Sequence, residues 1–151
     1  MPDQVLKNTF HIDVEPKVVL EHLTTPENYI GLSPIVVAVK DVDRSTPGVV
    51  RYVSIERFQF FKVIKWHNPI AVELFNDDSA VWGDVKSPGG VRMAYRFALS
   101  SEGSGTRVDD VLNLSAPSLL MGFAAGEARK VQLARARILV ERLTGSVGGP
   151  V

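Results

Sequence analysis

Residues 117–143 read PSLLMGFAAGEARKVQLARARILVERL, and this stretch decides the fold prediction. It contains no proline after Pro117, and its apolar residues recur at the spacing of a helix with 3.6 residues per turn. The apolar side of the helical wheel holds Met121, Ala124, Ala128, Val131, Ala136, Ile138, Leu139 and Leu143. The opposite side carries Glu127, Arg129, Lys130, Arg137 and Glu141. We therefore predict one long amphipathic helix that packs against a sheet.

The chain ahead of this helix has the pattern of an antiparallel sheet. Residues 10–14 alternate in the period of a half-buried strand, and Pro16 then begins a short helix that reaches Leu23. Thr25-Pro26-Glu27 begins a second short helix. Turn residues separate the later predicted strands, which are 35–42, 49–58, 60–66, 70–75, a short strand containing Val81 and Trp82, 91–99 and 106–115. Short links between consecutive strands predict an antiparallel meander.

Length and composition narrow the class of protein. The chain has 151 residues, 45% of them hydrophobic and 23% charged, so we expect one folded domain and exclude a disordered chain. Lys and Arg together number 17, as do Asp and Glu, and this balance argues against a nucleic-acid partner. There is no cysteine, which excludes disulfides, thiolate zinc sites and a cysteine nucleophile.

The sequence also indicates where in the cell the protein is expected. The start Met1-Pro2-Asp3-Gln4 lacks the basic and apolar regions of a signal peptide, and we expect a cytoplasmic protein. The charge-free stretch 111–126 is too short to span a bilayer comfortably, so we expect no integral membrane association.

Three short segments carry a resemblance to a known superfamily. They are Phe10-His11-Ile12-Asp13-Val14-Glu15-Pro16, Gly48-Val49-Val50-Arg51-Tyr52-Val53 and Gly105-Thr106-Arg107-Val108. With the order of the predicted elements, they make the chain similar to the START-like, or helix-grip (SRPBCC), superfamily and its polyketide cyclase/dehydrase-type members. The resemblance implies an α+β fold, in which a curved antiparallel sheet of about six or seven strands wraps around the long C-terminal helix, with two short helices after the first strand. It also implies a cavity for apolar molecules. We expect one such domain over residues 1–151, with a disordered tail at 144–151 because of its glycine-rich composition.

Arg51 and Asp110 are the candidate polar groups of that cavity. In the superfamily's plant hormone receptors, a matching Gly-x-x-Arg-x-Val pattern turns the arginine inward, which would place Arg51, Val53 and Ile55 inside. Alternation along 106–115 places Asp110 inward beside Val108, Leu112 and Leu114. A structural ion pair, or two solvated residues at the sheet edge, is the favoured alternative for Arg51 and Asp110.

Further candidates are aromatic, apolar or polar residues expected to face the same interior. Alternation in 60–66 places Lys62 and Trp66 there, and the remaining candidates for the wall are Tyr29, Trp82, Tyr95, Phe97, Met121 and Ala128. The helical wheel places Gln132 within the inner arc, where its amide could bond a ligand or, as we favour, a strand carbonyl. Apolar residues on these faces are equally typical of an ordinary core.

Catalytic and cofactor motifs are absent from the sequence. It has no phosphate-binding loop, dinucleotide fingerprint, hydrolase elbow or HExxH motif, and His11, His22 and His67 lie on different predicted elements. We therefore expect no metal and no cofactor, and Arg51 is the candidate for a catalytic group. His67 is expected in a solvated turn beside Asn68-Pro69.

The predicted function is binding of a hydrophobic small molecule, such as a lipid or polyketide, as a carrier or sensor. The alternative is a polyketide cyclase/dehydratase, or aromatase, that acts on a bound chain, and a further alternative is a protein-interaction module. Leu119, Leu120 and Phe123 are expected near the cavity entrance or at a homodimer contact.

Overall fold

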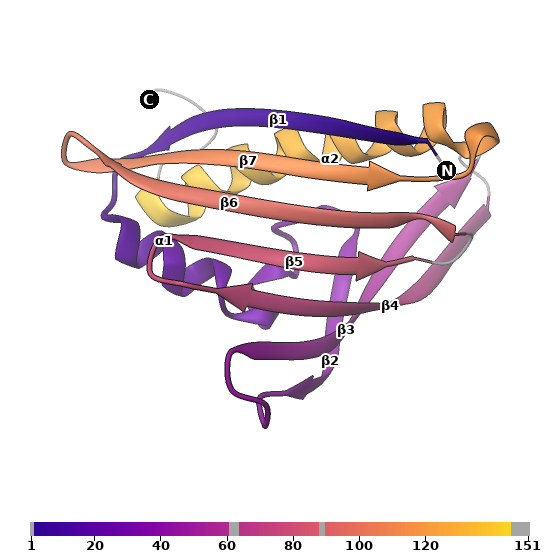
Figure 1. The fold of residues 1–151 in the computed structure, drawn as a ribbon, viewed down its shortest axis with the longest axis horizontal. Helices are drawn as coiled ribbons and strands as arrows, with labels where there is room; N and C mark the ends of the chain where they lie inside the picture. Colours follow the sequence, from indigo (N-terminus) through magenta and orange to yellow (C-terminus); the bar gives the residue numbers. More distant parts are fainter. Residues whose placement is uncertain (1, 61–63, 88–89, 146–151) are drawn as a thin grey trace.

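The computed structural model describes residues 2–60, 64–87 and 90–145, with backbone alone for 58–60 and 64–68. Within these residues, seven antiparallel strands form one curved sheet in the order β1-β7-β6-β5-β4-β3-β2 (Figure 1). The strands are β1 (Asp3–Ile12), β2 (Val36–Asp43), β3 (Val49–Phe60), β4 (Ile64–Asn76), β5 (Ala80–Lys86), β6 (Arg92–Glu102) and β7 (Gly105–Ser115). The predicted α+β helix-grip fold is confirmed.

The strand β4 corrects the predicted break at 67–69. It is continuous, with Pro69 paired to Ile55 of β3. Among the described residues, pairing of β4 with β5 begins at Ala71, and Pro69 has its strand neighbour on the β3 side. The predicted strand 60–66 is therefore in part the beginning of β4, and its residues 61–63 lie outside the described residues.

Two short helices follow β1, as predicted. Proline occupies the first turn of both α1 (Pro16–Leu23) and the 3-10 helix η1 (Pro26–Tyr29), where its missing N–H has no helical acceptor to lose. Val19 and Leu23 of α1 are fully buried in the core, so α1 closes one end of the interior.

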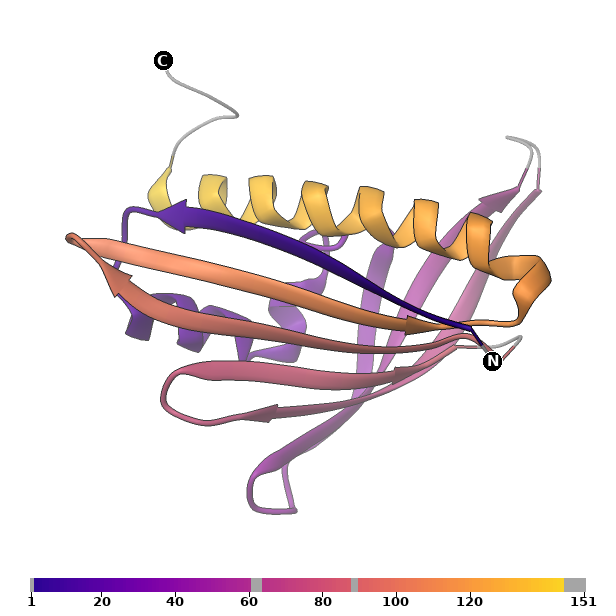
Figure 2. The same ribbon diagram turned by 45° about the horizontal axis from the view of Figure 1, so that its top comes forward.

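The long helix α2 (Ser118–Thr144) lies along the inner face of the sheet, next to β1 (Figure 2). It ends where Gly145 takes the left-handed conformation, with φ of 71°, and donates its N–H to Glu141. Near this end, Arg142 donates to the carbonyls of Asn28 and Ile30 at 2.5 and 2.7 Å, which ties α2 to η1. The predicted disordered tail lies, from residue 146 on, outside the described residues.

The burial of α2 differs between its two halves. Its C-terminal half buries Gln132, Arg135, Ala136 and Leu139, whereas its N-terminal half buries Ala125. Met121 and Ala128 are half-buried. The helix is therefore packed more deeply along its C-terminal half than along its N-terminal half.

No helix in the described part of the chain is both long and apolar enough to cross a membrane.

Candidate functional site

On strand β3, the side chains that face the interior form a row of polar residues. Tyr52, Ser54 and Glu56 are buried, and Tyr52 pairs in register with the buried Val72 of β4. Because successive side chains alternate, Arg51, Val53 and Ile55 lie on the outer face. The prediction that these three residues face inward is wrong. Both faces of this strand mix polar and apolar residues, so alternation did not identify the inner one.

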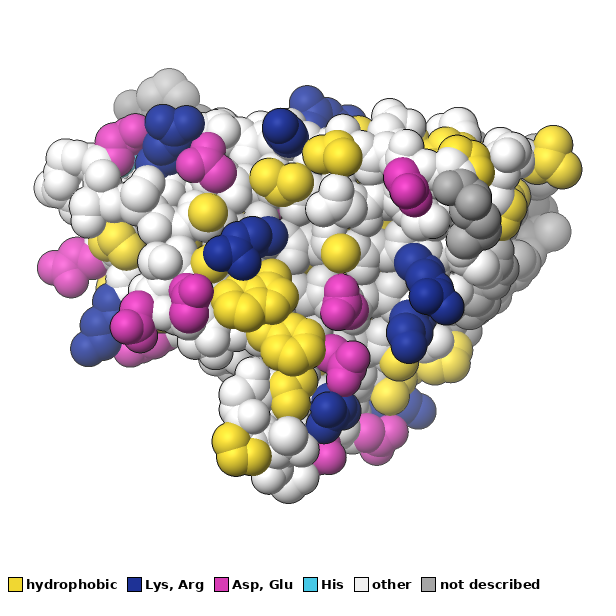
Figure 3. Space-filling view, viewed as in Figure 1, with side chains coloured by type: hydrophobic (Ala, Val, Ile, Leu, Met, Phe, Trp, Pro, Cys, Tyr) yellow, Lys and Arg dark blue, Asp and Glu magenta, His cyan; other side chains and the backbone are white. Residues whose placement is uncertain are grey.

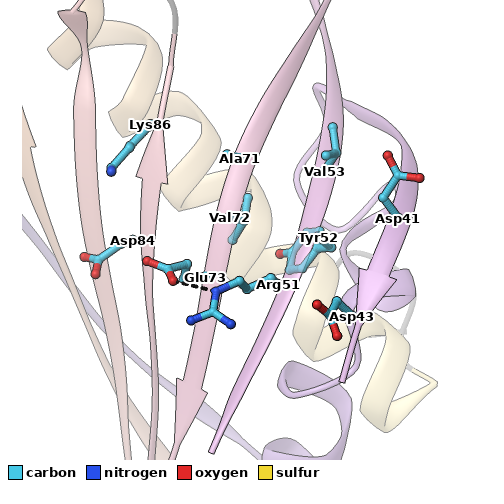
Figure 4. Close-up of a pocket in the computed structure, with 10 residues that line it drawn as sticks. All are labelled: Asp41, Asp43, Arg51, Tyr52, Val53, Ala71, Val72, Glu73, Asp84 and Lys86. Atoms are coloured by element: carbon cyan, nitrogen blue, oxygen red, sulfur yellow. Dashed lines mark hydrogen bonds and ion pairs between the residues drawn. The ribbon is translucent and has the colours of Figure 1, made fainter. Parts of the chain in front are cut away.

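Arg51 belongs to a polar cluster on the outer face (Figure 4). Its Nε donates to Glu73 Oε2 at 2.9 Å and its Nη1 donates to Thr46 Oγ1 at 3.1 Å. The Arg51 and Glu73 side chains remain 47% and 40% exposed. This hollow, of about 460 Å³, is also lined by Asp41, Asp43, Asp84 and Lys86. Arg51 is thus half of a surface ion pair, and its predicted partner Asp110 lies on the other face of the sheet.

Asp110 of β7 points inward, as predicted, and its partner is Arg135 of α2. Arg135 Nη2 donates to Asp110 Oδ2 at 2.9 Å, and the two side chains are 10% and 1% exposed. The guanidinium carbon lies 4.6 Å from the ring centroid of Phe97 and 5.7 Å from that of Tyr95. Within the described residues, Asp110 Oδ1 and Arg135 Nε are buried without a hydrogen-bond partner. This buried pair therefore retains one acceptor and one donor.

Aromatic residues surround this pair. Tyr29, Tyr95 and Phe97 are buried in the core, and the Tyr29 and Tyr95 ring centroids are 6.4 Å apart. Tyr29 donates its hydroxyl to the Leu23 carbonyl at 2.6 Å, and the hydroxyls of Tyr29 and Tyr52 are the polar neighbours of the Tyr95 hydroxyl. Burial raises the pKa of Tyr29, Tyr52 and Tyr95, so all three phenols stay protonated near neutral pH.

Glu56 is the other buried carboxyl group of the inner face. The residue directly opposite it on β4 is Asn68, whose side chain lies outside the described residues. Burial raises the pKa of Glu56 from 4.5 to about 7. The carboxyl is therefore shared between its neutral and charged forms near neutral pH.

Gln132 takes the role that we favoured for it. Its side chain is fully buried, its Nε2 donates to the Leu6 carbonyl at 3.2 Å and to the Asp110 carbonyl at 3.5 Å, and its Oε1 accepts from Arg129 at 2.8 Å. Gln132 thus joins α2 to β1 and β7.

The remaining predicted wall residues fall in three places. Met121 and Ala128 lie half-buried on α2. Trp82 lies on the outer face, where it stacks on Phe75 with centroids 6.1 Å apart and carries the Arg96 guanidinium 4.9 Å above its ring, so its predicted place in the interior is wrong. Figure 3 shows hydrophobic side chains gathered among charged ones on this outer face. Lys62 and the side chain of Trp66 lie outside the described residues.

The histidines do not form a site with one another. His11 lies between two carboxylates, with Nε2 2.7 Å from Asp13 Oδ1 and Nδ1 2.7 Å from Glu102 Oε1. His22 is near Arg142, and the backbone of His67 is in β4 opposite Arg57 rather than in the predicted turn. In the part of the chain that the structure describes, no three His, Asp or Glu side chains are arranged to hold a metal ion.

These features define a helix-grip protein whose interior contains buried polar groups. Solved structures share this fold. The Zhui aromatase/cyclase from Streptomyces sp. R1128 matches with a TM-score of 0.79 and 10% identity, over 99% of this chain and 100% of that one. A START superfamily protein from Mycobacterium smegmatis matches with a TM-score of 0.67 and 13% identity, over 92% and 98%. TTHA0849 from Thermus thermophilus matches with a TM-score of 0.66 and 19% identity, over 95% and 100%.

The sequence itself matches no protein-family model, and no curated protein matches it. The structural likeness establishes a START-like fold of the type found in polyketide aromatase/cyclases.

Proposed function

We propose that this protein binds a small hydrophobic molecule between α2 and the inner face of the sheet, as a carrier or sensor. The fold supports this function class, since the solved structures that share it include an aromatase/cyclase and a START superfamily protein. The predicted interior cavity would extend from the half-buried Met121 and Ala128 toward the Asp110–Arg135 pair.

One observation carries the proposal: Asp110 Oδ1 and Arg135 Nε are buried without hydrogen-bond partners among the described residues. A buried polar group without a hydrogen bond costs on the order of 1–3 kcal/mol. The polar end of a ligand, admitted by a small movement of the surrounding side chains, would supply the missing bonds. A donor beside an acceptor suits a ligand that offers both, such as a hydroxyl next to a carbonyl.

A polyketide cyclase or aromatase is the second candidate. It is favoured by two hydrogen-bond donors, Arg135 Nε–H and Tyr95 O–H, on one side of the interior. Such donors would stabilise the negative charge that develops on a carbonyl oxygen when a neighbouring carbon loses a proton. The carrier remains the first choice because the carboxylate beside these donors, that of Asp110, is already paired with Arg135.

Native mass spectrometry of the purified protein, followed by solvent extraction, tests the proposal. We expect a protein mass above that of the chain and an apolar compound in the extract. The extracted compound should displace the neutral apolar dye N-phenyl-1-naphthylamine. A protein that carries no compound and binds no dye would refute the proposal.

Tyr95→Phe separates the ligand role of the hydroxyl from a structural one. Removal of this hydroxyl, whose polar neighbours are the hydroxyls of Tyr29 and Tyr52, should change stability by at most about 1 kcal/mol, while affinity for the extracted compound falls about tenfold. The matched control Tyr29→Phe loses the bond to the Leu23 carbonyl and should be less stable. Turnover of the compound by the wild-type protein would favour the cyclase.

A further inference from the structure

Strand β1 is one of the two edge strands of the described sheet, and its ladder is regular. It pairs with β7 without a register shift from Asp3 to Ile12. The other edge strand, β2, has two register shifts against β3 and a left-handed residue, Asp41, with φ of 55°. Irregularities of this kind protect an edge from pairing with a further strand, and the described ladder of β1 contains none.

The backbone of β1 has hydrogen-bonding groups that β7 does not use. Ala116 donates its N–H to the Pro2 carbonyl, which places the even-numbered residues of β1 in the hydrogen bonds to β7. Because these bonds alternate along an antiparallel strand, residues 3, 5 and 7 direct their N–H and C=O groups away from β7. The Lys7 carbonyl agrees with this direction, since it accepts from Arg129 of α2 at 2.7 Å. A carbonyl oxygen can accept a second bond, so this contact does not close the edge.

The side chains along this edge are complementary to the same edge read in reverse. Asp3, Val5 and Lys7 are exposed, Val5 to 51%, and they alternate with Leu6, which packs against the core. Two β1 strands paired antiparallel and centred on Val5 would bring the two Val5 residues opposite each other. Each Asp3 would then lie opposite a Lys7 of the second copy, and opposite charges in such a pair stabilise it.

The surface beside β1 has room for a second strand. A hollow of about 460 Å³ is lined by residues 4–7 of β1 and by Ala125, Gly126 and Arg129 of α2, which runs alongside β1 (Figure 2). Gly126 and Gly122 are one helical turn apart, and no described heavy atom lies within 4 Å of where a Cβ on either would be. Helix α2 therefore presents little bulk where it borders this edge.

We propose that this edge is a contact between two copies of the chain, with their β1 strands antiparallel about a two-fold axis at Val5. The contact is isologous, because Asp3 meets Lys7 of the second copy while Lys7 meets its Asp3. It joins the two sheets into one and does not involve the Asp110–Arg135 pair, so it goes beyond the proposed function. A contact of this small size is typical of a dimer that dissociates at roughly micromolar concentration.

Sedimentation velocity of the full chain, from about 1 µM to about 100 µM, tests the proposal. We expect a reversible equilibrium between monomer and dimer. Lys7→Asp places two aspartates opposite each other and should weaken dimerisation at least about tenfold, as should Asp3→Lys. The double variant that carries both changes should dimerise again, since each pair then joins opposite charges. Lys40→Asp makes the same charge change on the other edge strand and should dimerise as the wild type does.

Crosslinking locates the contact independently. The chain has no cysteine, so Val5→Cys introduces a single thiol at the proposed two-fold axis. A bismaleimide with a short spacer should join two such chains in high yield. Val37→Cys is the matched control, because Val37 is 38% exposed on β2, and it should give little crosslinked dimer.

Three results would overturn the proposal. One is a wild-type protein that stays monomeric over the whole concentration range. Another is a dimer that both single charge variants leave intact, or that crosslinks equally at Val5 and Val37, because it would use another surface. The third is a double variant that stays monomeric, since the antiparallel register about Val5 would then be wrong.

Discussion

Gly83 of β5 lies directly opposite Tyr95 of β6, and a Cβ atom on Gly83 would come within 2.6 Å of the Tyr95 ring. The absence of a side chain at Gly83 therefore lets the Tyr95 phenol lie over β5 and reach the interior. Gly83 is a position where the backbone makes room for a candidate ligand-binding group.

Gly83→Ala should consequently destabilise the protein by about 1–3 kcal/mol, because the Tyr95 ring must move out of a packed interior. Gly122→Ala is the matched control, since this helix position has open space around it and alanine favours a helix. We expect Gly122→Ala to be stabilising by roughly 0.5–1 kcal/mol. Urea unfolding measures both, and equal effects would contradict the placement of Tyr95.

The Asp110–Arg135 pair should respond to substitution as a buried unit. Asp110→Ala leaves the Arg135 guanidinium buried without its anion, and we expect a loss of ~3–5 kcal/mol in the free energy of unfolding. The exposed pair provides the comparison, because Glu73→Ala should cost at most about 1 kcal/mol. A double variant, Asp110→Leu with Arg135→Met, should recover most of the loss. Chemical denaturation of the three variants tests this, and a small effect of Asp110→Ala would show that the pair is solvated.

The raised pKa of Glu56 predicts that the free energy of unfolding falls as pH rises. Its folded pKa, about 7, lies above its ordinary value of 4.5, so the folded state binds more protons between these values. The free energy of unfolding should therefore decrease between about pH 5 and pH 8, by at most roughly 3 kcal/mol from this group. Glu56→Gln should flatten this part of the profile, and an unchanged profile in the variant would contradict the burial of Glu56.

His11 should titrate above its ordinary pKa of 6.5. Hydrogen bonds to Asp13 and Glu102 favour its charged form and raise its pKa. The stabilisation that this gives is fully present below pH 6.5 and is lost as pH rises through the folded-state pKa of His11. NMR titration of the ring protons should show a lower His11 pKa in Asp13→Asn than in the wild type. Identical titration curves would mean that the contact to Asp13 does not form in solution.

The sequence was sufficient for the fold because the two periodicities are long and distinct. Alternation in the strands and the 3.6-residue spacing of 117–143 each extend over many residues, so local exceptions such as Pro69 changed the boundaries of strands but not the architecture. Asp110 was correctly placed because its strand companions Val108, Leu112 and Leu114 are all apolar.

The site was only partly predictable, because its polar residues occupy positions that a hydrophobic pattern assigns to the surface. Arg135 was missed although it shares a stripe of α2 with Ala128, Gln132 and Leu139, and that spacing is the signal that could have identified it. The partner of Asp110 is 25 residues away along the chain, on another element, and sequence alone does not specify such a contact.

Glu56 was missed for a related reason. The arginine pattern that the chain shares with plant hormone receptors favoured the opposite face of β3. In the structure, Tyr52 is buried on the same face of β3 as Glu56, so this face is the inner one. A sequence pattern does not reveal this, because a tyrosine is compatible with either face.

The central claim is that the ligand lies between α2 and the inner face of the sheet. An NMR titration of the isotope-labelled protein with decan-1-ol tests it most directly, because the probe is neutral and each backbone amide reports its own surroundings. We predict shifts concentrated at Glu56, Tyr95 and Asp110, with little change at Arg51 and Glu73 on the outer face. Shifts confined to the outer face, or no saturable shifts at all, would contradict the account.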